Sequence, residues 1–288
     1  MPRIDAHHHL WRYNSEDYGW IGEDRRSLRR DFLLPDLRHE LALAGVDGTV
    51  AVQAQQTVAE TDRLLELAGK DSPIWGVVGW LPLADLGVEA MLDRYTAVGA
   101  LKGLRHVVQD EPSGFLDGDA FNRGVRLLHG RGLVYDLLLF AHQLPEAIRF
   151  VDRHPHQSFV LDHLGKPAIA QGALEPWAAG LRELARRPHV TCKVSGMVTE
   201  TDWLRWSPAE LQPYFDVALE AFGAHRLMIG TDWPVLTVGC GYRQWWQTVE
   251  LWVQSLSTAE QAGILGENAA RTYSLQPQPD LDSTGVAR

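Results

Sequence analysis

Cysteine is scarce in this chain. Only Cys192 and Cys240 occur among 288 residues, and their separation does not match the spacing of a metal site. Two cysteines are too few for the disulfide framework that stabilises small secreted domains. We interpret both as small core-filling thiols, so the fold must depend on a hydrophobic core rather than on cross-links.

Long apolar runs are also missing. No stretch approaches the roughly 18–20 uninterrupted apolar residues of a membrane span. The segment Met1–Asp5 lacks the apolar core of a signal peptide. We therefore expect a cytoplasmic protein with no membrane partner.

Positive charge is in deficit, and glycine-rich phosphate-binding loops are lacking. Lysine and arginine number 27 against 37 aspartates and glutamates, which gives a net charge of −10. Such a surface repels phosphate backbones, so nucleic acid is not an expected partner. Neither Gly-x-Gly-x-x-Gly after a strand nor Gly-x4-Gly-Lys-Ser/Thr is found, so nothing indicates a nucleotide-binding fold.

The chain does contain a regular series of short apolar runs that predict strands. Several are nearly continuous in Val, Ile and Leu, as expected for parallel strands covered on both faces. The predicted strands are Arg3–His8, Gly48–Gln55, Ile74–Leu81, Leu101–Val108, Val134–Phe140, Phe159–His163, Val190–Val194 and Arg226–Thr231.

Amphipathic segments between these runs predict helices. Pro35–Ala44 ends at Gly45, a suitable C-terminal cap, and Thr61–Gly69 carries leucines at helical spacing. Capping boxes are indicated at Ser207–Glu210 and Ser257–Glu260, and Asn268–Tyr273 is predicted as a closing helix. Residues 276–288 are predicted to form a disordered tail.

Eight strands alternating with helices, with no break in composition, favour one α/β domain. The prediction is a single-domain (β/α)8 TIM barrel over residues 1–275. A doubly wound open sheet is the alternative. Length agrees with the barrel, which typically takes about 250 residues.

The first strand carries polar side chains where apolar ones are expected. Because strand residues two apart share a face, Asp5, His7 and His9 are predicted to point the same way, into the barrel, with His8 on the other face. Two imidazoles in a His-x-His pattern can hold one divalent ion or one substrate. Hydrogen-bonded core histidines are the alternative, but burying three polar groups on one strand is costly, which favours function.

The last predicted strand ends at Asp232, just before a Trp-Pro pair. Barrel enzymes keep their catalytic groups at this end of the strands. A carboxylate there can act as a general base toward water or as a metal ligand. The alternative is an aspartate that caps the next turn; together with His7 and His9, we favour function.

Two further strand ends contribute candidates. His163 follows the sixth strand and can polarise a carbonyl or protonate a leaving oxygen, with Asp162 predicted on the opposite face. Lys166 follows in the loop, where a solvated surface lysine is nearly as good an interpretation. Arg105 on the fourth strand is predicted to point inward and to hold a substrate oxygen, with a buried ion pair as the alternative and His106 facing the helices.

Other side chains are candidate pocket linings. Trp80 ends the third strand and Trp233 follows Asp232, and both could recognise a substrate. For Trp80 and for the remaining candidates a structural role is at least as well supported: Gln53, Gln55, Lys193 and Ser195.

Together these motifs resemble the amidohydrolase superfamily, and within it the branch of sugar-acid lactone hydrolases that includes L-fuconolactonases and L-rhamnonolactonases. The resemblance runs from Ile4 to Leu275. It is carried by Ile4–Trp11, Gly103–His106, Leu161–Pro167, Cys192–Gly196, Gly230–Val235 and Asn268–Tyr273.

The resemblance implies a TIM barrel with His7 and His9 as the paired first-strand histidines, His163 on the sixth strand and Asp232 on the eighth. Many metal-dependent members have a histidine ending the fifth strand, where this chain has Phe140. Arg105 cannot replace the bridging lysine or glutamate of two-metal members. Either no metal or a single divalent ion (zinc or manganese) on His7, His9 and Asp232 is therefore expected.

The predicted activity is hydrolysis of a sugar-acid lactone, with Asp232 as general base and His7, His9, His163 or Arg105 stabilising the oxyanion. The partner would be a small-molecule lactone, and homo-oligomerisation is left open. A metal-dependent decarboxylase or amide hydrolase on the same barrel is one alternative. A non-catalytic sugar-binding barrel is the other.

Overall fold

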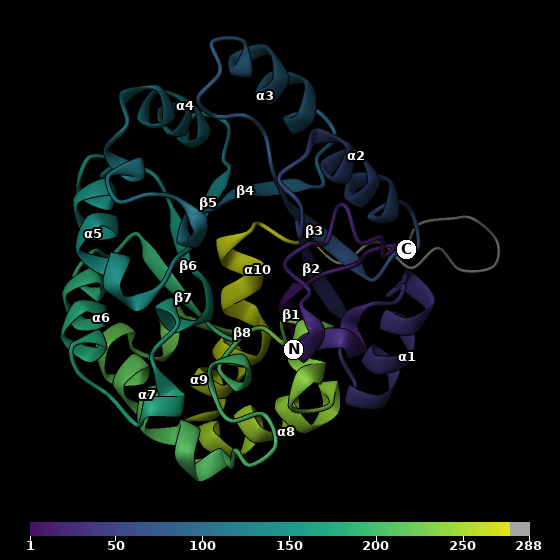
Figure 1. The fold of residues 1–288 in the computed structure, drawn as a ribbon, viewed down its shortest axis with the longest axis vertical. Helices are drawn as coiled ribbons and strands as arrows, with labels where there is room; N and C mark the ends of the chain where they lie inside the picture. Colours follow the sequence, from purple (N-terminus) through teal and green to yellow (C-terminus); the bar gives the residue numbers. More distant parts are fainter. Residues whose placement is uncertain (277–288) are drawn as a thin grey trace.

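Eight parallel strands form one sheet in the order of the chain (Figure 1). The structure is a computed structural model, and it describes residues 1–276. The strands are β1 Ile4–His8, β2 Gly48–Val52, β3 Ile74–Gly79, β4 Leu101–Val107, β5 Val134–Leu138, β6 Phe159–Leu161, β7 Val190–Val194 and β8 Leu227–Ile229.

The sheet closes on itself between the end of β1 and the residues that follow β8. The amide of Asp232 donates to the carbonyl of His7 over 2.8 Å, and the amide of His9 donates to the carbonyl of Trp233 over 2.6 Å. These bonds make the sheet a barrel and place Asp232 beside the histidines of β1. The (β/α)8 barrel predicted from the sequence is confirmed.

Helices surround the strands on the outside of the ring in Figure 1. Buried aliphatic and aromatic residues fill the layer between them, as expected for strands that are apolar on both faces. The helices are α1 Leu34–Ala44, α2 Val58–Leu67, α3 Val88–Thr96, α4 Asp119–His129, α5 Leu144–Asp152, α6 Trp177–Ala185, α7 Pro208–Phe222, α8 Tyr242–Val253, α9 Thr258–Ala262 and α10 Asn268–Thr272.

Local signals explain several helix boundaries. Gly45 ends α1 with φ of 66°, a left-handed conformation that glycine adopts without steric cost. Both hydrogen bonds of the predicted capping box join Ser257 and Glu260 at α9. At α7, the Ser207 hydroxyl accepts from the Glu210 amide.

Helix α10 occupies a different place, since it lies within the ring in Figure 1. Its Ala269 and the following Tyr273 and Leu275 pack against the first inward residues of the strands, including Ile4 and Val134. The end of the chain thereby closes the N-terminal opening of the barrel, leaving the C-terminal opening for a site.

Six predicted strands end too late: β2 by three residues, β3, β5, β6 and β8 by two, and β4 by one. The residues beyond these ends turn away to form the upper rim of the barrel. The predicted tail, 276–288, lies outside the described residues except for Gln276. Among the described helices, none is long and apolar enough to cross a membrane.

Candidate active site

Four buried side chains converge at the C-terminal opening of the barrel. His7 lies one residue before the end of β1, His9 follows that strand, His163 follows β6 and Asp232 follows β8. Oδ1 of Asp232 lies 3.3 Å from Nε2 of His9, 3.7 Å from Nε2 of His7 and 3.9 Å from Nε2 of His163. The structure thus brings together the four residues predicted as catalytic.

The first strand is not regular, and this corrects one prediction. Asp5 pairs with Thr49 but His8 pairs with Ala51, so β1 has one extra residue between these positions. Such a bulge reverses which face later side chains occupy. His7 and His9 therefore point into the barrel, whereas Asp5 points outward, and the prediction that all three share a face is wrong.

Asp5 instead links β1 to the residues that follow β8. Its carboxylate accepts hydrogen bonds from the amide and hydroxyl of Thr231 (2.9 and 2.6 Å) and from the hydroxyl of Tyr242 (2.9 Å) on α8. Burial raises the pKa of Asp5 to about 6, against the effect of these donors. Asp5 therefore supports the rim next to Asp232 without reaching the site.

The end of β6 corrects a second prediction. Asp162 and His163 were expected on opposite faces, but both face the barrel interior, where Asp162 contacts Arg105 and His163 contacts Asp232. The cause is a left-handed turn that starts at His163 (φ 54°) and continues through Lys166 (φ 49°). Asp232 also has a positive φ of 60°. Non-glycine residues held in this region store strain, which is concentrated at functional sites.

The hydrogen bonds of the histidines define their protonation. Nδ1 of His9 lies 2.8 Å from the carbonyl of Val52, which only accepts, so this nitrogen carries a proton. Nδ1 of His163 lies 2.8 Å from the Ser195 hydroxyl. Burial lowers the pKa of His163 to about 4, so this ring is neutral near pH 7.

Asp232 is ionised despite its burial. Burial alone would raise its pKa, but His163, His9 and Lys166 together hold the pKa of this carboxyl below its ordinary value. A buried carboxylate that is charged at neutral pH and faces the barrel opening can accept a proton from water. The geometry therefore suits a general base.

A column of charged side chains lies beneath the site. Arg105 on β4 donates to Asp162 over 2.9 Å, and Lys193 on β7 lies 3.0 Å from Asp162 and 2.6 Å from Asp136 on β5. The hydroxyl of Tyr273 donates to Asp136 from below. Arg105 points inward as predicted, and its guanidinium binds Asp162 and the carbonyl of Gln53.

Sequence reasoning missed Asp136, Tyr273 and the central position of Asp162. A signal was available, because Asp136 stands in the middle of the apolar run Val134–Phe140. An ionisable residue inside a buried strand needs a charged partner, and Lys193 in the equally apolar β7 is such a partner.

The predicted substrate-binding residues lie at different distances from the centre. Lys166 donates to Gln109 over 2.6 Å and lies 5.2 Å from the centre of the Phe140 ring, at the rim. Trp80 donates to His106 on the outer side of β4. The ring of Trp233 packs against Phe32 rather than toward Asp232. Of these three, Lys166 is the one placed to meet a ligand.

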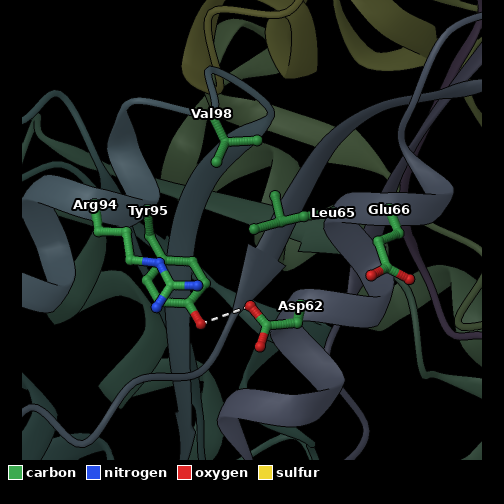
Figure 2. A pocket seen from close by; sticks show the side chains of 6 residues that line it. All are labelled: Asp62, Leu65, Glu66, Arg94, Tyr95 and Val98. Atoms are coloured by element: carbon green, nitrogen blue, oxygen red, sulfur yellow. Dashed lines mark hydrogen bonds between the residues drawn. The ribbon is translucent and has the colours of Figure 1, made fainter.

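Surface hollows lie away from this centre. One of about 430 Å³ lies between α2 and α3, outside the barrel wall, where Tyr95 donates to Asp62 (Figure 2). Another, of about 230 Å³, lies beside the loops after β4 and β5, and Gln109 connects it to Lys166. The first has no link to the site, and the second adjoins its rim.

The site also has the donors of a metal centre. Ligand atoms of His7, His9 and Asp232 lie within 4.8 Å of one another, as do those of His7, Asp162 and His163. The first set fits a divalent ion better, because two imidazoles and a carboxylate facing an opening are the ligands that zinc prefers, whereas Asp162 is already paired with two cations. Oδ1 of Asp162 lies 3.0 Å from Nζ of Lys193 and 3.4 Å from Nδ1 of His7, so this carboxylate stands behind one of the candidate ligands.

The amidohydrolase family profile matches residues 4–275. The chain belongs to the amidohydrolase family. This amidohydrolase is 44% identical to an L-fucono-1,5-lactonase of Burkholderia multivorans, over 96% of this chain and 97% of that one. It is 35% identical to an L-fucono-1,5-lactonase of Burkholderia ambifaria, over 81% and 80% of the two chains. The resemblance inferred from the motifs is confirmed.

A solved structure agrees with these sequence relationships. An amidohydrolase from Burkholderia multivorans with bound zinc has a TM-score of 0.93 and 43% identity to this amidohydrolase, and the match covers 96% of this chain and all of that one. The family profile over residues 4–275 spans the barrel and every residue of the candidate site.

Proposed function

We propose that this protein hydrolyses a sugar-acid lactone, such as L-fucono-1,5-lactone or a related L-rhamnonolactone, to the open acid. One observation carries the proposal: an ionised, buried Asp232 surrounded by three histidines in a chain 44% identical to an L-fucono-1,5-lactonase. A sugar-binding protein without turnover would have no need for a charged carboxylate held in strained backbone at the opening.

Asp232 acts as the general base in this proposal. It takes a proton from water, and the water oxygen forms a bond to the lactone carbonyl carbon. The bond from that carbon to the ring oxygen then breaks, and the ring oxygen receives the proton. Each positioned proton transfer of this kind contributes about 10²–10⁴-fold to a rate.

His163 is suited to stabilising the oxyanion that forms when water attacks. The Ser195 hydroxyl can donate to its Nδ1, which leaves a proton on Nε2, the atom that faces Asp232. A neutral imidazole held this way can stabilise the oxyanion through its Nε2–H, while the proton that Asp232 took from water goes to the leaving ring oxygen. Arg105 acts indirectly, because its guanidinium is bound to Asp162.

Recognition of sugar hydroxyls is assigned to the rim. Lys166 and its partner Gln109 offer a donor and an acceptor beside the opening. Trp80 and Trp233 pack in the shell around the site, so they shape the rim rather than contact the reacting atoms. The partner of this site is a small molecule.

A single zinc or manganese ion fits His7, His9 and Asp232. Such an ion, when bound, polarises a carbonyl and makes a nearby water more acidic. The residues themselves supply the base, the neutral donor and the hydroxyl contacts described above.

The test is lactone opening, followed by proton release, on a panel of L- and D-sugar lactones with enzyme as purified and after chelation. We expect turnover of an L-fucono- or L-rhamnonolactone. Activity that survives chelation would mean that the side chains suffice, and activity restored by zinc or manganese would make His7, His9 and Asp232 ligands. No turnover of any lactone in either state would overturn the proposal.

A further inference from the structure

Two consecutive hydrogen bonds connect the end of β3, the end of β4 and the loop after β4, residues 108–114 (the β4 loop). The indole Nε1 of Trp80 donates to Nδ1 of His106 over 3.2 Å, and Nε2 of His106 lies 2.7 Å from Oε1 of Glu111. An indole N–H only donates and a carboxylate only accepts, so the ring accepts at Nδ1 and donates at Nε2. Both contacts therefore select the same tautomer of a neutral ring.

Aromatic packing holds the His106 ring in this orientation. The ring stacks on Phe115 with centroids 4.7 Å apart and planes inclined by 17°, and it meets the edge of Phe121 at 5.7 Å. Aromatic rings prefer such stacked and edge-to-face arrangements. Nε2 of His106 therefore points in a fixed direction on the outer side of β4, and Glu111 is the residue that accepts its hydrogen bond.

The contact between Glu111 and His106 closes the segment that carries Gln109. Before Gln109, the amide of Val107 and the carbonyl of Val108 each hydrogen-bond to a side chain from another part of the rim, at 2.9 Å. After Gln109, the side chain of Glu111 supplies the next contact with the barrel wall. Closing a short loop in this way reduces the conformations that the residues within it can reach.

Gln109 is the residue of the β4 loop that meets the rim of the candidate site. Nζ of Lys166 donates to its Oε1 over 2.6 Å. Because an ammonium only donates, the amide oxygen of Gln109 must face Lys166. Within residues 1–276, no side chain or backbone group accepts from the NH2 group of Gln109. This NH2 group is therefore available to donate to a hydroxyl oxygen of a substrate.

We propose that Glu111 is a positioning residue for substrate binding: through His106 it fixes the β4 loop, so that Gln109 meets both Lys166 and a substrate hydroxyl. This inference rests on the proposed function, because it names the residues that hold a sugar-recognising side chain in place. Glu111 acts through Gln109 and does not touch the reacting atoms. Its loss therefore weakens substrate binding and leaves the chemical step unchanged.

The first test reads the Gln109 side chain without turnover. In deuterated, ¹⁵N-labelled protein, the NH2 signals of Gln109 are assigned by their loss in Gln109→Ala. We expect Glu111→Ala to move these signals toward those of exposed glutamines, whereas Glu111→Gln leaves them in place because its amide oxygen still accepts from His106. Asp110→Ala is the matched control, since Asp110 is the exposed carboxylate next to Glu111. Unchanged signals in Glu111→Ala would overturn the proposal.

The second test measures KM and kcat for the lactone that the wild-type protein opens. Glu111→Ala should raise KM about fivefold, the size of one ordinary hydrogen bond, with kcat changed by less than about twofold. Glu111→Gln should restore the wild-type KM, and Asp110→Ala should not change it. In the Gln109→Ala background, Glu111→Ala should raise KM no further, because its effect passes through Gln109.

Three kinetic results would overturn the proposal. The first is an unchanged KM in Glu111→Ala. The second is an equal rise of KM in Glu111→Gln, which would mean that the lost charge and not the lost hydrogen bond is responsible. The third is additive effects of Glu111→Ala and Gln109→Ala on KM. If the wild-type protein opens no lactone, the proposed function fails, while the NH2 signals of Gln109 still decide whether Glu111 positions that side chain.

Discussion

Two adjoining layers inside the barrel differ sharply in chemistry. The lower layer, near α10, is apolar and consists of Ile4, Ala6, Val50, Val52, Val78, Val134, Val160 and Met228. The layer above it, the charged layer, consists of His7, Arg105, Asp136, Asp162 and Lys193. On β5 and β6 the change takes two residues: Val134 gives way to Asp136, and Val160 to Asp162.

The difference shows that the two layers have different roles. Apolar contacts in the lower layer stabilise the fold as they are removed from water. Buried ion pairs such as Lys193–Asp136 contribute little net stability, because desolvation offsets their attraction. What the charged layer supplies is fixed geometry directly under His7, which is what a site at the opening requires.

The largest effect is expected at Asp232, above both layers. Asp232→Asn should lower kcat by about 10³-fold, within the range of a lost general base, because the amide cannot take a proton from water. The melting temperature should stay within a few degrees, since this residue faces the opening. Steady-state kinetics measures kcat, and thermal unfolding measures the melting temperature. A kcat within tenfold of the wild-type value would show that Asp232 is not the general base.

The next effect compares the two layers on one strand. Asp162→Ala leaves Arg105 and Lys193 without their shared carboxylate and should lower the free energy of unfolding by about 3–5 kcal/mol. Val160→Ala, two residues away, removes two methyl groups and should lower it by about 2 kcal/mol. Urea unfolding of both variants measures the difference.

A charge-balanced double variant sharpens this comparison. Asp162→Leu with Lys193→Met removes one charge of each sign, so it should recover most of the stability lost in Asp162→Ala while activity stays low. If Asp162→Ala is less damaging than Val160→Ala, the charged layer is not held together by its ion pairs and the contrast between the layers fails.

The contrast also explains what could be predicted from the sequence. The apolar layer belongs to runs of Val, Ile and Leu, so the eight strands and the barrel follow from pattern alone. His7, His9, His163 and Asp232 were found because polar residues at strand ends are unusual. Their meeting follows from the closure of the barrel.

Features that depend on single backbone irregularities could not be predicted. The bulge in β1 turns Asp5 outward, and the left-handed turn at His163 brings two neighbouring residues to one side. Periodicity assumes a regular strand and therefore fails at both places. The Lys193–Asp136 pair was missed for another reason, because strands two apart in the sequence must be placed in the barrel before their side chains can be matched.

A smaller effect is expected at the rim. Lys166→Met should raise KM for the lactone about tenfold, or about 1.4 kcal/mol, with kcat changed less than threefold, because Lys166 hydrogen-bonds Gln109 and acts on Asp232 only through its charge. The exposed Lys70 provides a control, and Lys70→Met should leave both constants unchanged. A fall in kcat at constant KM would instead place Lys166 in the chemical step.

The smallest effect concerns a buried polar residue outside the barrel, His154, whose partner is neutral rather than charged. Its Nε2 lies 2.8 Å from Oδ1 of Asn122, and burial lowers the pKa of His154 from 6.5 to about 4. Because the folded state binds this proton less readily than the unfolded state, the free energy of unfolding is highest above pH 6.5. It falls as the pH drops toward 4.

His154→Gln keeps a donor to Asn122 but cannot be protonated. Between pH 7 and 5.5 the variant should lose less unfolding free energy than the wild type, by about 1 kcal/mol, in paired urea titrations. His8 and His163, whose pKa values burial lowers in the same direction, are present in both proteins and cancel from this difference. Equal losses of unfolding free energy in the two proteins would mean that His154 takes up its proton in the folded state at no cost. A neutral amide partner would then stabilise a buried charge as well as the ion pairs of the charged layer do.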